Sequence, residues 1–352
     1  MHMADALLSP AVATTMYAAT AAAAAYSINK VRKDDDPAKL PVMAVTSALV
    51  FAGQMINYTI PGTGSSGHMC GGMLLSALLG PEAGFLSMIV ILSIQCLFFA
   101  DGGLMALGAN CWNMAFYGCF VGYYLIWRPI MKSKWFGEGA NAKRARIIAA
   151  SIIGCVITLQ LGAFSVVIET SLSGITELPF GAFCGLMLPI HLAIGLIEGL
   201  ITSAVLVFVF NSRPELLMDV GPEEGTGAKR SLKSVVAILG IVALAVGGGL
   251  SLLASSNPDG LEWALFGNED GGYSRNMGLD EENFGVSSNA AEKAGEIQEK
   301  TSFLPDYAFS DSDTPAGTTV SGIVGAAIVA LAAVLICFAG GFFRKRNTHQ
   351  KE

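Results

Sequence analysis

The sequence predicts an all-α integral membrane protein, and three observations support this fold class. First, 53% of its 352 residues are hydrophobic and only 14% are charged, whereas a soluble globular chain carries about 25% charged residues. Second, the apolar residues come in long runs, and a helix needs roughly 20 such residues to cross a bilayer. Third, the basic residues gather in a few places between these runs, as they do in cytoplasmic loops.

Nine apolar runs are candidate membrane helices. The third of them is short and follows a glycine-rich loop, which is compatible with a partly re-entrant segment. Non-helical backbone is tolerated at membrane depth where protein or a cavity covers it. The nine runs are about 11–29, 40–58, 68–79, 82–100, 104–127, 147–170, 182–211, 234–254 and 318–343.

Charge predicts how the chain is oriented in the membrane. Basic residues cluster at 30–33, 128–146, 213–233 and 344–351, and nine crossings place all four clusters in the cytoplasm. The N-terminus and the acidic segment 255–316, which has thirteen Asp or Glu and three Lys or Arg, then lie outside. The sequence thus predicts a multi-pass cell-membrane protein with the N-terminus outside and the C-terminus in the cytoplasm. The basic residues form no contiguous face of the kind that binds nucleic acid.

A polar stretch divides the chain into two predicted units. Residues 1–211 hold seven of the apolar runs, residues 212–233 form a cytoplasmic linker, and residues 234–352 hold the last two runs. These last two runs flank the acidic segment 255–316. Its middle part, 268–300, is rich in Gly, Asn, Ser and Glu, which predicts loose order there. Two pairs of glycines in the first unit have helix-packing spacing, namely Gly181-x-x-x-Gly185 and Gly195-x-x-x-Gly199.

Two of the four histidines could bind a metal ion together. With His2 at the second position, the Met1 amine, the His2 amide and the His2 Nδ1 can chelate one ion in rings of five and six members. Three nitrogens in a plane leave one corner open, and square-planar nitrogen ligation is typical of Ni²⁺ and Cu²⁺. His68 follows a glycine-rich loop that is predicted on the same side of the membrane. Its imidazole could fill the open corner, although a surface histidine in a polar turn would have the same pattern.

Other polar residues have weaker signals. Asp101 and Asn110, in a loop and helix start on the same predicted side, could orient His2 or His68 as supporting partners. Helix capping explains Asp101 as well. His191 and Glu198 lie seven residues apart on one apolar run and so share a helix face. Ionisable groups inside a membrane are costly and usually paired or functional, so these two form a possible intramembrane polar pair.

Several catalytic and cofactor motifs are absent from the sequence. It contains no G-x-x-x-x-G-K-[ST] phosphate loop and no H-E-x-x-H metal motif, and no G-x-S-x-G nucleophile elbow. None of the seven cysteines forms C-x-x-C, so neither a disulfide framework nor a zinc-thiolate site is expected. We therefore expect neither an enzyme nor an organic cofactor, and any ATP that the protein's work consumes must be hydrolysed by another chain.

Four segments resemble the substrate-binding membrane subunit of energy-coupling-factor transporters for cobalt and nickel. They are Met1-His2-Met3-Ala-Asp5-Ala-Leu-Leu-Ser9-Pro10, Asn57-Tyr-Thr-Ile-Pro-Gly-Thr-Gly-Ser-Ser-Gly-His68, Asp101-Gly-Gly-Leu-Met-Ala-Leu-Gly-Ala-Asn110 and Leu188-Pro-Ile-His191-Leu-Ala-Ile-Gly-Leu-Ile-Glu198. Pro258-Asp-Gly-Leu-Glu262 and Pro305-Asp306-Tyr307 resemble the small partner protein of the same system, here fused to the first unit.

The resemblance implies a bacterial or archaeal uptake transporter subunit with a seven-helix unit into which the N-terminus is tucked. It implies that Ni²⁺ or Co²⁺, as the transported substrate, is held by the Met1 amine, the His2 amide and imidazole, and the His68 imidazole. Asn57, Asp101 and Asn110 are then candidate supporting residues. It also implies partners, namely a separate transmembrane coupling protein and cytoplasmic ATPase subunits. The acidic segment 255–316 would gate or complete the loading of the metal.

Other functions stay open at this point. A metal-sensing membrane receptor or a metal-dependent membrane enzyme would need an output domain or a catalytic base, and neither is visible in the sequence. A self-sufficient secondary transporter or channel would be favoured by more charged residues in the spans than Glu169 and Glu198. Nitrogen ligation and the Irving–Williams order favour nickel over cobalt, but the same ligands could hold either ion.

Overall fold

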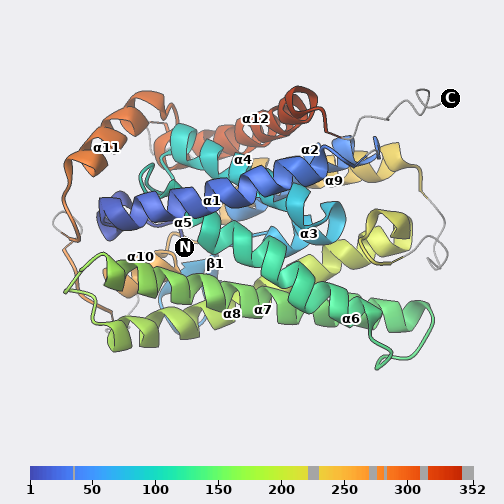
Figure 1. Ribbon diagram of the computed structural model, residues 1–352, viewed down its shortest axis with the longest axis horizontal. Helices are drawn as coiled ribbons and strands as arrows, with labels where there is room; N and C mark the ends of the chain where they lie inside the picture. Colours follow the sequence, from blue (N-terminus) through green and yellow to red (C-terminus); the bar gives the residue numbers. More distant parts are fainter. Residues whose placement is uncertain (35, 221–229, 269–275, 281–283, 310–315, 343–352) are drawn as a thin grey trace.

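The computed structural model of the protein describes residues 1–342 except 35, 221–229, 269–275, 281–283 and 310–315. Long helices run side by side along the longest axis of the molecule, and the N-terminus lies near one end of the bundle (Figure 1). The α-helices are α1 (Pro10–Val31), α2 (Lys39–Gln54), α3 (Gly72–Leu79), α4 (Pro81–Phe99), α5 (Leu107–Asn110), α6 (Arg128–Lys132), α7 (Ala140–Leu172), α8 (Phe180–Ser212), α9 (Leu232–Gly248), α10 (Gly260–Leu265), α11 (Asn289–Thr301) and α12 (Ala316–Gly340).

Shorter elements connect these helices. A π-helix, Cys111–Trp127, continues α5 into α6, and strands β1 (Tyr58–Ile60) and β2 (Ser65–Gly67) form a small antiparallel hairpin. The 3₁₀ turns are Asp5–Leu7, Pro214–Leu216, Leu250–Leu253 and Pro305–Tyr307. Local sequence signals mark several helix starts: Ser9 caps α1 just before Pro10, and Ser231 caps α9.

The fold class predicted from composition is confirmed, because the described chain is built almost wholly of helices. Four helices among the described residues are long and apolar enough to cross a membrane: Pro81–Phe99, Ala140–Leu172, Phe180–Ser212 and Ala316–Gly340. Two shorter helices, Lys39–Gln54 and Leu232–Gly248, are also apolar. All nine predicted runs overlap helices of the structure. That each of the nine crosses the bilayer stays a prediction.

The outer faces of α7 and α8 show why a lipid environment suits the bundle. These two helices pack against each other, and α7 also packs on the π-helix. Large apolar side chains nonetheless stay exposed along their outer faces, where lipid can cover them. They include Ile148, Ile153, Ile157, Phe164, Leu172, Leu192, Leu196 and Leu200.

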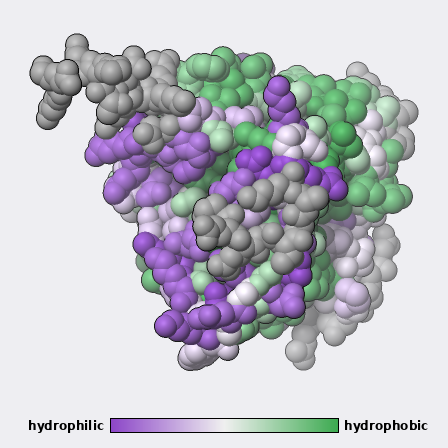
Figure 2. Space-filling view, turned by 90° about the vertical axis from the view of Figure 1, so that its right-hand side faces the viewer, coloured by the Kyte–Doolittle hydropathy of each residue, from purple (hydrophilic) through white to green (hydrophobic). Residues whose placement is uncertain are grey.

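Polar loops gather at the two ends of the bundle. At one end the Arg32 side chain donates to the Gly340 carbonyl (2.9 Å), and Arg128 and Lys132 lie near Asp219. Hydrophilic residues occupy much of this end, and hydrophobic residues its upper and right edges (Figure 2). Three of the basic clusters therefore share one end of the molecule, as predicted for loops on one side of a membrane. The fourth, at 344–351, lies outside the described residues.

The acidic segment is more ordered than its composition suggested. We expected loose order across 268–300, and this expectation is wrong for Asn289–Thr301, which forms α11. Ser288 caps the helix by accepting a hydrogen bond from the Ala291 amide. At its other end, the Gln298 side chain donates to the Gly102 carbonyl (2.7 Å). The cap and this hydrogen bond stabilise a helix that the polar composition alone does not predict. Within that range, 269–275 and 281–283 lie outside the described residues.

The two helices of the second predicted unit pack on the first. Both α9 and α12 contact α2, and they also contact each other. At their crossing, a Cβ added to Gly322 would lie 1.9 Å from the Gly247 carbonyl oxygen, so only glycine fits there. This packing brings the segment between α9 and α12 to the end of the bundle that holds the N-terminus (Figure 1).

Candidate metal centre

The first residues of the chain are buried inside the bundle rather than extended into solvent. Met1 is 4% exposed and Met3 is fully buried. The Asn110 side chain binds both backbone polar groups of Met3. Its Oδ1 accepts from the Met3 amide (2.8 Å) and its Nδ2 donates to the Met3 carbonyl (3.2 Å). The Gly103 amide donates to the same carbonyl (2.9 Å). Asn110, predicted as a supporting residue, therefore fixes the position of the N-terminus.

Two glycines between α4 and α5 make room for the N-terminal segment. Gly102 has a φ of +80°, and a Cβ on Gly103 would lie 1.8 Å from the Asp5 carboxylate. Any larger residue at 103 would push the segment away. The Asp5 carboxylate in turn accepts a hydrogen bond from the Ala106 amide (2.9 Å).

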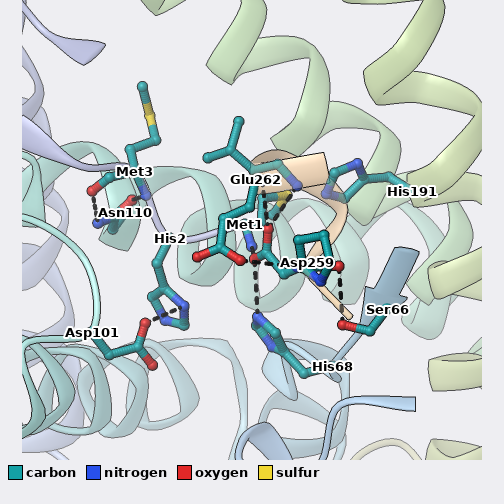
Figure 3. Close-up of polar contacts among 12 residues, drawn as sticks. Met1, His2, Met3, Ser66, His68, Asp101, Asn110, His191, Asp259 and Glu262 are labelled. Carbon is teal, nitrogen blue, oxygen red and sulfur yellow. Dashed lines mark hydrogen bonds and ion pairs between the residues drawn. The ribbon is translucent and has the colours of Figure 1, made fainter. Parts of the chain in front are cut away.

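His2 lies against Asp101, which the sequence made a candidate supporting residue. Its Nδ1 is 3.0 Å from Asp101 Oδ1, and Asp101 Oδ2 accepts from the Tyr307 hydroxyl (2.5 Å). Burial alone would raise the pKa of Asp101, but the His2 imidazole and then the Tyr307 hydroxyl hold that pKa below its ordinary value. This contact fixes the orientation of the His2 ring (Figure 3). His2 Nε2 is buried and has no partner among the described residues.

His68 follows the hairpin and lies beside His2. The two imidazole rings are stacked, with centroids 5.2 Å apart and planes 18° apart. His68 Nδ1 donates to the Met69 carbonyl (3.2 Å), so its Nε2 carries the free lone pair. Burial, and then the nearby N-terminal ammonium, lower the pKa of His68. Both effects keep the imidazole neutral, which is the form that binds metals.

Asp259, which we did not predict as a site residue, completes this cluster. Its Oδ2 accepts a hydrogen bond from the Met1 ammonium and lies 3.8 Å from His68 Nε2 (Figure 3). Its Oδ1 caps α10 by accepting from the Leu261 amide (2.7 Å) and the Glu262 amide (3.0 Å). Burial would lower the pKa of the Met1 amine, but the Asp259 carboxylate raises it. For Asp259 itself, burial would raise the pKa, but the ammonium and His68 hold it well below its ordinary value.

The hairpin and α8 hold the Asp259 turn in place. The Ser66 amide and hydroxyl donate to the Pro258 and Asn257 carbonyls, both at 2.8 Å. On the other side, a Cβ on Gly260 would lie 3.2 Å from the His191 ring. The hairpin that leads into His68 thus also positions Asp259. The capping-box spacing from Asp259 to Glu262, followed by an apolar run, is the sequence signal for this turn.

The remaining predicted residues lie around the cluster in different roles. His191 Nδ1 donates to the Met187 carbonyl (2.8 Å), whereas Glu198 accepts from the Cys70 and Gly71 amides (2.8 and 2.9 Å). The two side chains therefore have separate partners. Asn57 contacts the second unit through its carbonyl, which accepts from the Ser255 amide (2.7 Å). In the described part of the chain, His2 contacts Asp101 and His68 contacts the Met69 carbonyl, and no hydrogen bond joins either ring to the Asn57 side chain.

A cavity of about 10 Å³, the inner cavity, lies at the centre of these groups. Met1, His68, Cys70, His191 and Asp259 are among its lining residues. His191 Nε2 is buried and has no partner in the described part of the chain. An amine and two imidazoles around a space of this size are nitrogen donors of the kind that nickel and cobalt accept.

Comparisons with known proteins agree with a transport role for this arrangement. Residues 2–216 match the family model described as the cobalt uptake substrate-specific transmembrane region, and residues 233–340 match the PDGLE domain. A putative fused nickel transport protein of Archaeoglobus fulgidus is 34% identical over 337 residues, covering 94% of this chain and 95% of the relative. A fused nickel transport protein of Rhodobacter capsulatus is 30% identical, with the same shares covered.

Other relatives and solved structures cover a smaller share of the chain. A cobalt transport protein of Sorangium cellulosum is 31% identical, covering 53% of this chain and 80% of the relative. The crystal structure of a truncated transition metal transporter is 32% identical with a TM-score of 0.51, and covers 59% of this chain and 98% of that one.

Proposed function

The chain belongs to the cobalt uptake substrate-specific transmembrane family, and from this premise we propose that it captures Ni²⁺ or Co²⁺ outside the cell and mediates import of the ion. Its relatives are metal transport proteins rather than enzymes. One observation supports the proposal most strongly. The fold buries the N-terminal amine and His68 beside the inner cavity and stacks His2 on His68, although burying a charged terminus is costly.

The ligand set follows from the chemistry of these groups. The Met1 amine, the His2 amide and the His2 Nδ1 form the three-nitrogen chelate, and His68 Nε2 supplies a fourth donor. In the structure, Asp259 holds the amine and Asp101 holds His2 Nδ1. Metal binding therefore requires the amine to leave Asp259 and the His2 ring to turn toward the ion. Planar nitrogen ligation favours nickel, and cobalt fits the same donors.

We propose that other chains supply the energy for transport. The sequence has no phosphate loop, so ATP would be hydrolysed by separate cytoplasmic ATPase subunits and coupled through a separate transmembrane protein, as in energy-coupling-factor transporters. The gathering of three basic clusters at the end opposite the N-terminus supports a cytoplasmic position for that end. The metal cluster would then face the outside.

Within this function we assign one role to each unit. Residues 1–211 form the metal-binding unit, residues 212–233 the cytoplasmic linker, and residues 234–352 the two-helix unit that carries the acidic segment 255–316. The contact of Asp259 with the Met1 amine supports a role for that segment in loading the metal.

Metal binding to the purified chain tests the proposal. We expect wild type to bind about one Ni²⁺ or Co²⁺ tightly, and His2→Ala, His68→Ala and a chain with one residue added before Met1 to lose this binding. The added residue keeps both imidazoles but moves the amine away, so it tests the chelate specifically. A matched control is Cys184→Ala, on α8 and outside the cluster. Normal binding by the extended chain would refute the chelate.

A further inference from the structure

A second, larger cavity lies next to the metal cluster. This outer cavity has a volume of about 410 Å³ and opens to the surface. Its walls come from both units: the N-terminal segment and the α4–α5 loop on one side, and α10 and α11 on the other. The polar side chains that line it are His2, Asp5, Asp101, Asp259, Glu262, Gln298 and Asp306.

The outer cavity is strongly acidic. It has five carboxylates, and the described residues that line it include no Lys or Arg. Asp306 pairs with no described residue, and Glu262 uses only its Oε2, which accepts from the Asp259 amide (3.1 Å). Carboxylates of one charge that line a low-dielectric cleft focus a negative potential inside it. Its volume is large enough for a divalent ion that keeps its water shell.

An unpaired nitrogen gives the cavity a second feature that points to a cation. The His2 side chain is 8% exposed and lines the cavity. Its Nδ1 lies against the Asp101 carboxylate, which can only accept, so Nε2 carries the lone pair. Nε2 is buried without a partner among the residues that the structure describes. A buried lone pair of this kind is costly unless a ligand or water uses it.

Asp259 connects this cavity with the inner one. Among the described lining residues, it is the single residue that the two cavities share. Its Oδ2 faces the Met1 amine and His68, which are two of the proposed ligands. An ion that leaves the outer cavity for the inner one therefore passes this carboxylate.

We propose that the outer cavity holds a hydrated divalent cation before it is bound, and that Asp259 transfers the ion from there to Met1, His2 and His68. This proposal rests on the proposed function and adds a second, weaker cation site to it. The ion exchanges its water for the Asp259 carboxylate and displaces the Met1 ammonium from it. The freed amine loses its proton to water and then binds the ion, and the His2 amide loses its own proton to water as it binds. The site would be shared between the two units of the chain.

A manganese titration of the full chain tests the weaker site on its own. Mn²⁺ prefers oxygen ligands, and its bound and free forms are counted by electron paramagnetic resonance. In a His68→Ala background, where the inner site is incomplete, we expect about one weakly bound Mn²⁺. Adding Glu262→Gln and Asp306→Asn should abolish it. Gln preserves the capping box, and Asn tolerates the positive φ of residue 306.

The loading rate tests the transfer. In the chain with an intact inner site, Glu262→Gln with Asp306→Asn should slow Ni²⁺ association on the order of ten-fold and weaken its salt dependence. The final stoichiometry should not change. The matched control is Glu296→Gln with Glu299→Gln. It removes the same charge from the exposed face of α11, outside the cavity, and should leave both measurements unchanged.

The outcomes separate this proposal from the proposed function. Mn²⁺ binding that is absent, or that falls equally in the control, would overturn the outer site. An unchanged Ni²⁺ association rate in the cavity variant would overturn the transfer. Tight Ni²⁺ binding by His68→Ala would instead contradict the inner site, and the comparison of cavity and control variants would still decide the outer one.

Discussion

At the scale of single residues, the ion pair between the Met1 ammonium and Asp259 links the start of the chain to the second unit. The folded pKa of the amine is raised above 8.0, so this group contributes stability that is fully present below pH 8.0 and lost as pH rises through the raised pKa. The folded pKa of Asp259 lies well below 3.8, so its contribution is present above pH 3.8 and lost as pH falls through the lowered pKa. The pair therefore stabilises the folded protein most between pH 3.8 and pH 8.0.

We predict that Asp259→Asn weakens the docking of α10 on the N-terminus. Asn can still cap α10 but cannot pair with the ammonium, so we expect a loss of about 2 kcal/mol. The loss should be largest near neutral pH and shrink above pH 8.0, because the amine of the opened state then begins to lose its charge and the paired amine loses its own as pH rises through its raised pKa. Hydrogen exchange of Gly260–Leu265 across a pH series measures the effect. Equal protection in both proteins at neutral pH would contradict it.

The sequence made His2 and His68 candidates but not Asp259, for a physical reason. One histidine is at the second position and the other follows a glycine-rich loop. Their nitrogen donors are enough to suggest metal binding without any knowledge of the fold. Asp259 is one of thirteen acidic residues in 255–316, and its role depends on a contact across 258 positions of the chain. Its cap spacing predicts a helix start, but no local pattern indicates what the second carboxylate oxygen faces.

At the scale of elements, the glycine pairs of α8 show that two similar sequence motifs can pack differently in the fold. A Cβ on Gly199 would lie 2.6 Å from the Ile152 Cα on α7, so the two backbones meet there. Around Gly181, nothing lies within 4 Å of the same position. Spacing alone gave both pairs the same interpretation, because it does not say which helix face has a neighbour.

We predict that Gly199→Ala separates α7 from α8 and lowers the thermal stability of the purified protein. Overpacking at a backbone contact typically costs 1–3 kcal/mol, so we expect a loss of about 2 kcal/mol. Gly181→Ala is the matched control and should be neutral or slightly stabilising, because alanine favours the helix. Melting curves in one detergent compare the two variants. Equal melting temperatures would show that the close approach at Gly199 does not contribute.

Hydropathy predicts long elements better than short ones. The apolar runs located α4, α7, α8 and α12 because each must be covered along its whole length by protein or lipid. The β1–β2 hairpin was not predicted, since three-residue strands have too few positions for any alternation. Likewise α11 has few large apolar side chains, and it is ordered by its cap and by Gln298.

At the scale of the whole molecule, the two units meet along one continuous surface. In the described part of the chain, α9 and α12 pack on α2, while the segment between them reaches the metal cluster through Asp259, Gln298 and Tyr307. The fused arrangement therefore keeps this segment beside the N-terminus at a high effective concentration.

We predict that replacing residues 255–316 with a short Gly/Ser linker reduces nickel uptake by cells at least ten-fold at low metal concentration. The crossing of Gly247 and Gly322 shows that α9 and α12 lie close together there, so a short linker can join them without moving either helix. The replacement removes Asp259 and one wall of the outer cavity, so loading slows while His2 and His68 remain. Raising external nickel should restore part of the uptake, because a slow bimolecular loading step speeds up with concentration.

Uptake of radioactive nickel is compared with that of the Glu296→Gln, Glu299→Gln chain. If the linker chain matched this control at every nickel concentration, the segment would have no part in loading.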